Sequence, residues 1–182
     1  MTQTTIPFNF SRNNPKTMIV AHRGIWERAP ENSILAIEHA IQAGIDIVEI
    51  DTQKCATGEF VVIHDETLDR TTNGRGLVAQ TTLEQIKTLR LRQRDGGASN
   101  TLSDQTLPLL SDLLKHAQGK IMVNIDAKTQ KTYPKSFRKW KDFTCKTSPL
   151  LNQDTTHQII RCGIRLTTTV RHMPMLCSQK IN

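Results

Sequence analysis

Apolar runs of two different periods alternate along the first 128 residues of this 182-residue chain. A short apolar run at 18–21 precedes isoleucines at helical spacing in 34–43, and a β-branched run follows at 45–51. Further strand and helix patterns occupy residues 60–65, 107–119 and 120–128. Strands that alternate with helices of about 10–15 residues predict parallel βα units and therefore an α/β fold.

Helix boundaries are marked by short local signals. Asn32 or Ser33 can begin the first helix after a proline, and Gly44 is a natural stop. Thr81 stands three residues before Glu84, which predicts a capping box at the start of another helix.

Charge divides the chain at residue 128. Residues 1–128 hold 14 Lys+Arg and 15 Asp+Glu, whereas residues 129–182 hold 10 Lys+Arg and only two acids. We expect an N-terminal extension at 1–16, a folded unit at 17–128 with a less regular insertion at 65–107, and a basic tail at 129–182. The tail has no sustained period, so we expect it to be disordered or translated out of frame.

The bulk composition limits where and with what the protein works. The chain has no apolar run of membrane-spanning length, and its N-terminus has no basic start followed by an apolar block. We therefore expect a cytoplasmic protein with no transmembrane segment and with its four cysteines free. The basic tail could suit nucleic acid or an anionic membrane, but an unstructured tail without specific nucleic-acid binding is favoured. The composition predicts no oligomeric state.

Four apolar runs end in groups that can do chemistry: His22-Arg23, Glu49-x-Asp51, His64-Asp65 and Asp126-x-Lys128. In parallel βα folds the carboxyl ends of the strands carry the active site, so we expect these groups to meet. Side chains two apart on a strand face the same way, which places two carboxylates of one run together. Such a pair indicates either a hard cation such as Mg²⁺ or Ca²⁺ or a salt bridge on a solvent face.

This set of groups suits phosphoryl transfer. A cation neutralises phosphate charge, an arginine can hold two phosphate oxygens, and histidines exchange protons near neutral pH. The sequence contains no glycine-rich P-loop and no GxGxxG, which disfavours nucleotide-dependent kinase and hydride-transfer chemistry.

The motifs AHRG, PENS, VEID and HDETLDRTTNGRG resemble, in order and spacing, those of the glycerophosphodiester phosphodiesterase family. The resemblance covers about residues 17–128. It implies a (β/α)₈ barrel of the TIM type with a small insertion, and hydrolysis of glycerophosphodiesters to glycerol 3-phosphate and an alcohol with a divalent cation.

Residue by residue, the resemblance implies His22 and His64 as the general acid/base pair and Arg23 as a phosphate-binding group. It implies Glu49 and Asp51 as two metal ligands. The family's third ligand is typically a glutamate in an E-x-K motif, and NIDAK occupies that place. Asp126 would then be the shorter third ligand, and Lys128 a second phosphate-binding cation.

A complete barrel of this type needs about 250 residues, so the recognisable part supplies about four βα units. We expect a barrel truncated by a frameshift near residue 128, with exposed sheet edges and low stability. Two functions follow: a metal-dependent phosphodiesterase of phospholipid and glycerol metabolism, acting on a small glycerophosphodiester, or an inactive fragment of such an enzyme.

Overall fold

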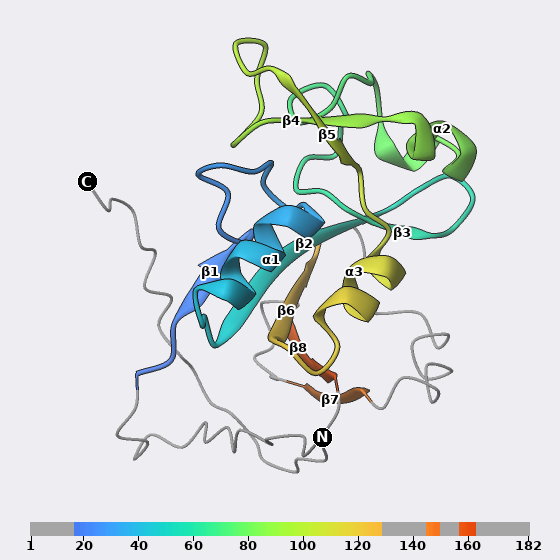
Figure 1. The fold of residues 1–182 in the computed structure, drawn as a ribbon. Coiled ribbons are helices and arrows are strands. Elements are labelled where there is room, and N and C mark those ends of the chain that lie inside the picture. Colours follow the sequence, from blue (N-terminus) through green and yellow to red (C-terminus); the bar gives the residue numbers. More distant parts are fainter. Residues whose placement is uncertain (1–16, 129–144, 150–156, 163–182) are drawn as a thin grey trace.

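The computed structural model describes residues 17–128, 145–149 and 157–162. Within them one six-stranded sheet is covered on one face by helices, and a two-stranded sheet lies beside it (Figure 1). The elements are β1 (Val20–His22), α1 (Ile34–Gln42), β2 (Ile47–Lys54), β3 (Phe60–Val62), the 3₁₀ turn η1 (Val78–Gln80), α2 (Leu83–Thr88), β4 (Arg90–Arg92), β5 (Leu102–Thr106), α3 (Leu110–Ala117), β6 (Met122–Ala127), β7 (Cys145–Pro149) and β8 (His157–Cys162).

Three parallel strands form the part of the sheet that matters for the site. β2 lies between β1 and β6, with Glu49 opposite Asn124 and Asp51 opposite Asp126. Helix α1 connects β1 to β2, as the alternating pattern predicts. It begins after Ser33, whose hydroxyl accepts the Ala36 N–H at 3.0 Å, so the second of the two predicted N-caps is the correct one.

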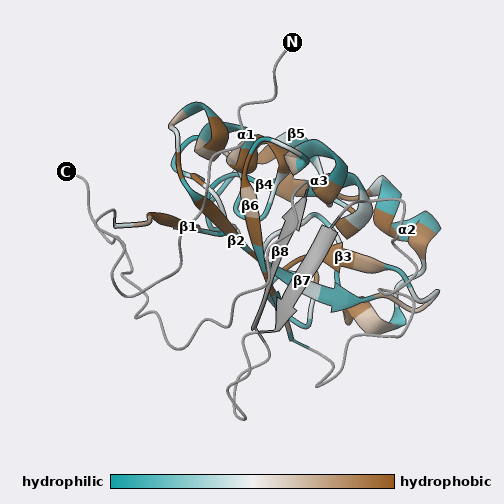
Figure 2. Cartoon of the chain, turned by 90° about the horizontal axis from the view of Figure 1, so that it is seen from below, coloured by the Kyte–Doolittle hydropathy of each residue, from teal (hydrophilic) through white to brown (hydrophobic). Residues whose placement is uncertain are grey.

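The two faces of this sheet carry different chemistry. Alternate residues of β2 and β6, among them Ile50 and Ile125, are buried against α1 and α3 in one apolar cluster. Figure 2 shows β6 coloured largely hydrophobic, and α3 with hydrophobic and hydrophilic residues in turn. The opposite face of the same strands carries the acidic residues. No helix among the described residues is long and apolar enough to cross a membrane.

The run at residues 60–65 differs from its prediction as a parallel strand. β3 pairs with β2 in the antiparallel direction, Val62 opposite Thr52, after a tight turn in which the Gly58 N–H donates to Cys55 O. No helix separates the two strands, so they form a hairpin rather than a βα unit. His64 therefore follows the carboxyl end of an antiparallel strand, and the chain there lies beside the middle of β2.

Residues 65–107 hold η1, α2 and the β4–β5 sheet, which pack on a second apolar cluster with residues of β3. The capping box of α2 is formed by Thr82 and Gln85, so the prediction of Thr81 with Glu84 was wrong by one residue. Both pairs satisfy the same sequence pattern, and the backbone selects the second.

β7 and β8 fall inside the predicted basic tail. β8 pairs with β6 and with β7, in both cases antiparallel. The predicted extension at 1–16 and the rest of 129–182 lie outside the described residues, so the proposed disorder or frameshift stays a prediction.

Candidate active site

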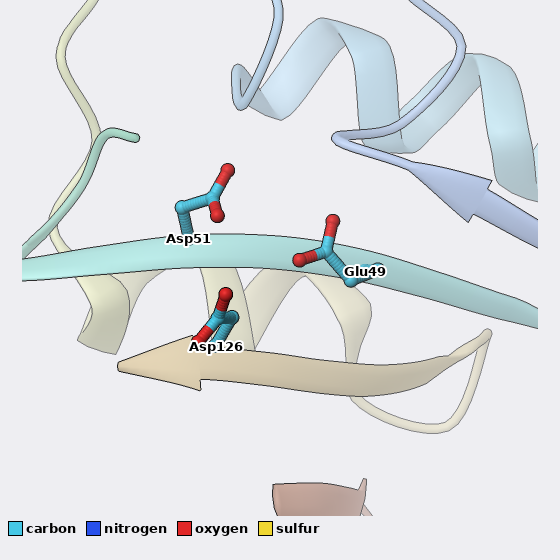
Figure 3. A group of neighbouring side chains, drawn as sticks. All are labelled: Glu49, Asp51 and Asp126. Atoms are coloured by element: carbon cyan, nitrogen blue, oxygen red, sulfur yellow. The ribbon is translucent and has the colours of Figure 1, made fainter. Parts of the chain in front are cut away.

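Three carboxylates from two neighbouring strands meet on the sheet face away from the helices (Figure 3). Glu49 and Asp51 come from β2, and Asp126 comes from β6 directly opposite Asp51. One oxygen of each carboxylate lies within 4.8 Å of the others. Glu49 and Asp51 are almost fully buried, at 3% and 1% exposure, so water does not screen the repulsion between their charges.

Burial and the neighbouring charge of Asp51 raise the pKa of Glu49 to about 7. Burial would also raise the pKa of Asp51, but hydrogen bonds from Asn32 and Lys128 outweigh it and hold that pKa below its usual range. The two acids therefore differ: Asp51 is charged at neutral pH, whereas Glu49 titrates close to it, because burial and repulsion outweigh the help from Arg23 N–H and Lys128.

Two cations border the acidic cluster. Lys128 Nζ lies 3.0 Å from Asp51 Oδ1 and also donates to Asp126 Oδ2. Arg23 Nη1 lies 3.0 Å from Glu31 Oε2, and its Nε lies 3.0 Å from Asp51 Oδ2. That last contact is an ion pair without hydrogen-bond geometry, so the buried Nε–H has no hydrogen-bond acceptor among the described residues.

The backbone turns sharply after β1, which places Arg23 beside the acidic cluster. Arg23 has a φ of 59°, an unusual value for a residue with a side chain. Its N–H donates to Glu49 O at 2.9 Å and lies 3.2 Å from Glu49 Oε2. Strained backbone of this kind is often found where a side chain must be held for function.

The two histidines come from different elements. His22, at the end of β1, places Nε2 3.9 Å from Glu49 Oε2, and burial together with Arg23 lowers its pKa. His64 follows β3, and its Nδ1 lies 2.7 Å from Asp65 Oδ1. His64 is linked to the site through Asp65 and Arg70, because Arg70 also contacts Glu31, the partner of Arg23. Six of the seven predicted site residues thus contact one another directly, and His64 joins them through Asp65, Arg70 and Glu31.

Sequence reasoning assigned no site role to four residues that contact this group. Glu31 and Asn32 belong to the PENS motif, which identified the family resemblance but was given no role in the site. Asp65 and Arg70 belong to the HDETLDRTTNGRG motif, and Arg70 Nε lies 2.7 Å from Asp65 Oδ2. Arg70 Nη2 also lies 2.7 Å from Glu31 Oε1, although the two residues are 39 positions apart in the sequence. No local sequence pattern could have indicated a contact over that separation.

The donor set and its surroundings fit a hard cation. Three carboxylate oxygens in one small volume are the ligands that Mg²⁺ and Ca²⁺ prefer. Besides the Arg23 Nε–H, the buried Oδ1 of Asn124, opposite Glu49, has no hydrogen-bond partner among the described residues. Unmatched polar atoms beside an acidic cluster indicate a place for an ion, water or polar ligand.

Comparison with known proteins finds similarity to glycerophosphodiester phosphodiesterases. A glycerophosphodiester phosphodiesterase of Caldanaerobacter subterraneus is 41% identical over 115 residues, which are 63% of this chain and 46% of that protein. The crystal structure of a glycerophosphodiester phosphodiesterase from Agrobacterium tumefaciens matches with a TM-score of 0.56 and 39% identity, over 62% of this chain and 47% of that one.

A phosphodiesterase from Oleispira antarctica, solved in complex with the product sn-glycerol-3-phosphate, matches with a TM-score of 0.53 and 32% identity, over 62% of this chain and 44% of that one. The chain spans about half the length of the relatives that it matches. These likenesses imply the TIM-barrel fold, of which the described residues form a partial α/β sheet without a closed barrel.

The model of the glycerophosphoryl diester phosphodiesterase family matches residues 22–168. This confirms the family predicted from the motifs, and the match runs past residue 128 into the predicted tail. Because it covers most of the sequence, the chain belongs to the glycerophosphoryl diester phosphodiesterase family.

Proposed function

We propose that this chain hydrolyses glycerophosphodiesters to glycerol 3-phosphate and an alcohol, with a divalent cation held by Glu49, Asp51 and Asp126. The observation that carries the proposal is the approach of these three carboxylates to within 4.8 Å, beside His22 and two cations. The product bound to the Oleispira antarctica relative agrees with a small phosphate-containing substrate.

The cation would be Mg²⁺ or Ca²⁺, because all three ligands are carboxylate oxygens. When bound, it would neutralise phosphate charge and polarise a phosphoryl oxygen. It would also offset the burial and the repulsion from Asp51 that together raise the pKa of Glu49 to about 7.

The remaining groups bind the substrate and move its protons. Arg23 has a buried Nε–H without a hydrogen-bond acceptor in the described part of the chain, and a phosphate oxygen would supply one. Lys128, already between Asp51 and Asp126, would give a second positive charge. His22 and His64 would act as the general acid/base pair, one taking the proton of the nucleophile and the other protonating the leaving alcohol.

The test uses the full chain with glycerophosphocholine as substrate. Release of glycerol 3-phosphate that stops with a chelator and returns with Mg²⁺ or Ca²⁺ is the expected result. Titration calorimetry measures binding of each cation separately. Cation binding without product release would favour the second candidate, an inactive part of such an enzyme, which the chain's span of about half its relatives suggests. No cation binding would refute the proposed ligand set.

The cytoplasmic location and the use of a small-molecule substrate without specific nucleic acid remain predictions from sequence. Fractionation of cells that express the chain would test the first. A retardation assay with DNA and RNA at physiological salt would test the second.

A further inference from the structure

One ring nitrogen of His64 is engaged by the residue that follows it. His64 Nδ1 lies 2.7 Å from Asp65 Oδ1. An ionised carboxylate can only accept a hydrogen bond, so Nδ1 must be the nitrogen that carries a hydrogen. This leaves Nε2 of the neutral ring as the nitrogen able to exchange a proton with a substrate.

Arg70 keeps Asp65 ionised and fixed. Its Nε lies 2.7 Å from Asp65 Oδ2 and its Nη2 lies 2.8 Å from Asp65 Oδ1, a two-point contact that sets the plane of the carboxylate. These hydrogen bonds outweigh partial burial and hold the pKa of Asp65 well below its usual range. At any pH where the site would work, Asp65 is therefore an acceptor.

Arg70 is itself held from both sides. Nη2 donates to the buried Glu31 at 2.7 Å, and Nη1 donates to the backbone oxygen of Asp95 in the insertion. Glu31 shares its oxygens with Arg23, at 3.0 and 3.2 Å. One continuous set of ion pairs thus runs from Arg23 through Arg70 to the ring of His64.

The main chain of His64 has a separate support. The side-chain amide of Gln53, only 1% exposed on β2, donates to His64 O at 3.0 Å. The backbone is therefore placed by the sheet, whereas the rotation and tautomer of the ring depend on Asp65. This separation lets a change at Asp65 disturb the ring without moving the strand.

We infer that Asp65 and Arg70 are positioning residues for His64, which fix its ring in the Nδ1–H tautomer and leave Nε2 free for proton transfer. The inference rests on the proposed function, in which His64 is one of the acid/base pair. A purely structural ion pair in the turn would affect stability but would not select a histidine tautomer.

The tautomer can be read directly in the full chain labelled with ¹⁵N-histidine, where two-bond ¹⁵N–¹H spectra distinguish Nδ1–H from Nε2–H rings. His64 is assigned by comparison with His64→Gln. We expect the Nδ1–H form in the wild type and loss of that preference in Asp65→Ala. Arg70→Lys, which keeps the charge but loses the two-point contact, should weaken the preference.

Asp69→Ala is the matched control, because Asp69 lies in the same segment and accepts the Gly76 N–H rather than contacting His64. An unchanged His64 tautomer in Asp65→Ala, or an equal change in Asp69→Ala, would overturn the inference. If Asp65→Ala does not fold, Asp65→Asn serves. Its amide can turn oxygen or NH₂ toward Nδ1, so both tautomers are expected, and the Nδ1–H form alone would overturn the inference.

Kinetics give a second readout where the chain turns over. Asp65→Ala should then lower kcat by roughly 10²-fold or more, with a smaller change in KM, because the variant replaces no group proposed to contact the substrate. An unchanged kcat would overturn the inference. A chain that never turns over refutes the proposed function, while the tautomer measurement still decides the role of Asp65.

Discussion

Asn32 contacts Asp51 through both ends of its side-chain amide. Its Nδ2 donates to Asp51 Oδ2 at 3.0 Å, and its Oδ1 accepts the Asp51 N–H at 3.2 Å. Both residues are buried, so replacing Asn32 by Ala removes one hydrogen bond from a carboxylate oxygen, which keeps its ion pair with Arg23, and one from a backbone N–H. We expect a loss of about 1–3 kcal/mol in the free energy of unfolding, measured by urea denaturation.

The backbone of Asn32 adds a second cost, since its φ of 58° lies in the left-handed region. Asn32→Gly removes the same two hydrogen bonds but relieves this strain, so it should be less destabilised than Asn32→Ala by about 1 kcal/mol. Equal stability of the wild type and both variants would show that the amide does not hold Asp51.

Asp126 is expected to be the third metal ligand although it is shorter than the glutamate typical of the family. Asp126→Asn should weaken Mg²⁺ or Ca²⁺ binding by roughly tenfold or more, since the loss of a direct ligand should cost at least as much as the loss of an outer-shell partner. The change should far exceed that of Asn124→Ala, a neutral neighbour on β6. Asp112→Asn on the exposed face of α3 controls for net charge. Identical calorimetric titrations for wild type and Asp126→Asn would exclude Asp126 as a ligand.

The two histidines are expected to carry proton transfer. His22→Ala and His64→Ala should each lower kcat by roughly 10²–10⁴-fold in a glycerol 3-phosphate release assay. His116→Ala is the control, because His116 pairs with Glu38 between α3 and α1, away from the acidic cluster. A near-normal kcat in either site variant would remove that histidine from the mechanism.

Gly24 permits the close approach of the turn after β1 to helix α1. Its φ is +83°, and a Cβ there would lie 2.8 Å from both the backbone carbon and the Cβ of Ala36. Gly24→Ala should therefore cost about 2–4 kcal/mol in unfolding free energy, from backbone strain and overpacking together.

Gly44→Ala separates these two effects, because Gly44 has a φ of +68° but no atom within 4 Å of an added Cβ. It should cost only the backbone strain, about 1–2 kcal/mol. If Gly24→Ala is no more destabilised than Gly44→Ala, the contact with Ala36 is not limiting.

The Asp65–Arg70 pair predicts a feature of acid unfolding. The pKa of Asp65 is lowered in the folded protein, so the pair stabilises the fold above the unfolded pKa of about 4 and this contribution fades as pH falls further. Asp65→Asn should be less stable than the wild type at neutral pH by about 1 kcal/mol, a small figure because the pair is partly exposed. The difference should shrink below pH 4. A difference that stays constant down to pH 2.5 would contradict the pairing.

Local patterns predicted the parts of this structure that depend on neighbouring residues. The first βα unit and the shared facing of Glu49 and Asp51 follow from apolar period, which repeats over one strand or helix turn. The direction of β3 could not be predicted in this way, because it is set by the turn before Gly58 and by pairing with Thr52. A short apolar run has the same sequence pattern in a parallel and in an antiparallel strand, so the pattern cannot predict the strand's direction.

The residues of the candidate site likewise include some that the sequence could predict and some that it could not. The seven predicted residues come from motifs within a few positions of a strand end, so the sequence could nominate them. The support from Glu31 to Arg70 joins side chains 39 positions apart through a folded insertion. Only the packing of that insertion on the sheet decides whether such a pair forms.

The ion pairs around the site also determine its net charge. Five carboxylates take part (Glu31, Glu49, Asp51, Asp65 and Asp126), and three permanent cations face them (Arg23, Arg70 and Lys128). With every acid ionised and both histidines neutral, two negative charges remain, the number that one divalent ion cancels. Arg70 belongs to the insertion, so under the proposed function a part of the chain outside the parallel strands would help to set the charge of the ion that the site binds. A relative that replaced Arg70 by a neutral residue would need to lose one of these acids to keep that valence.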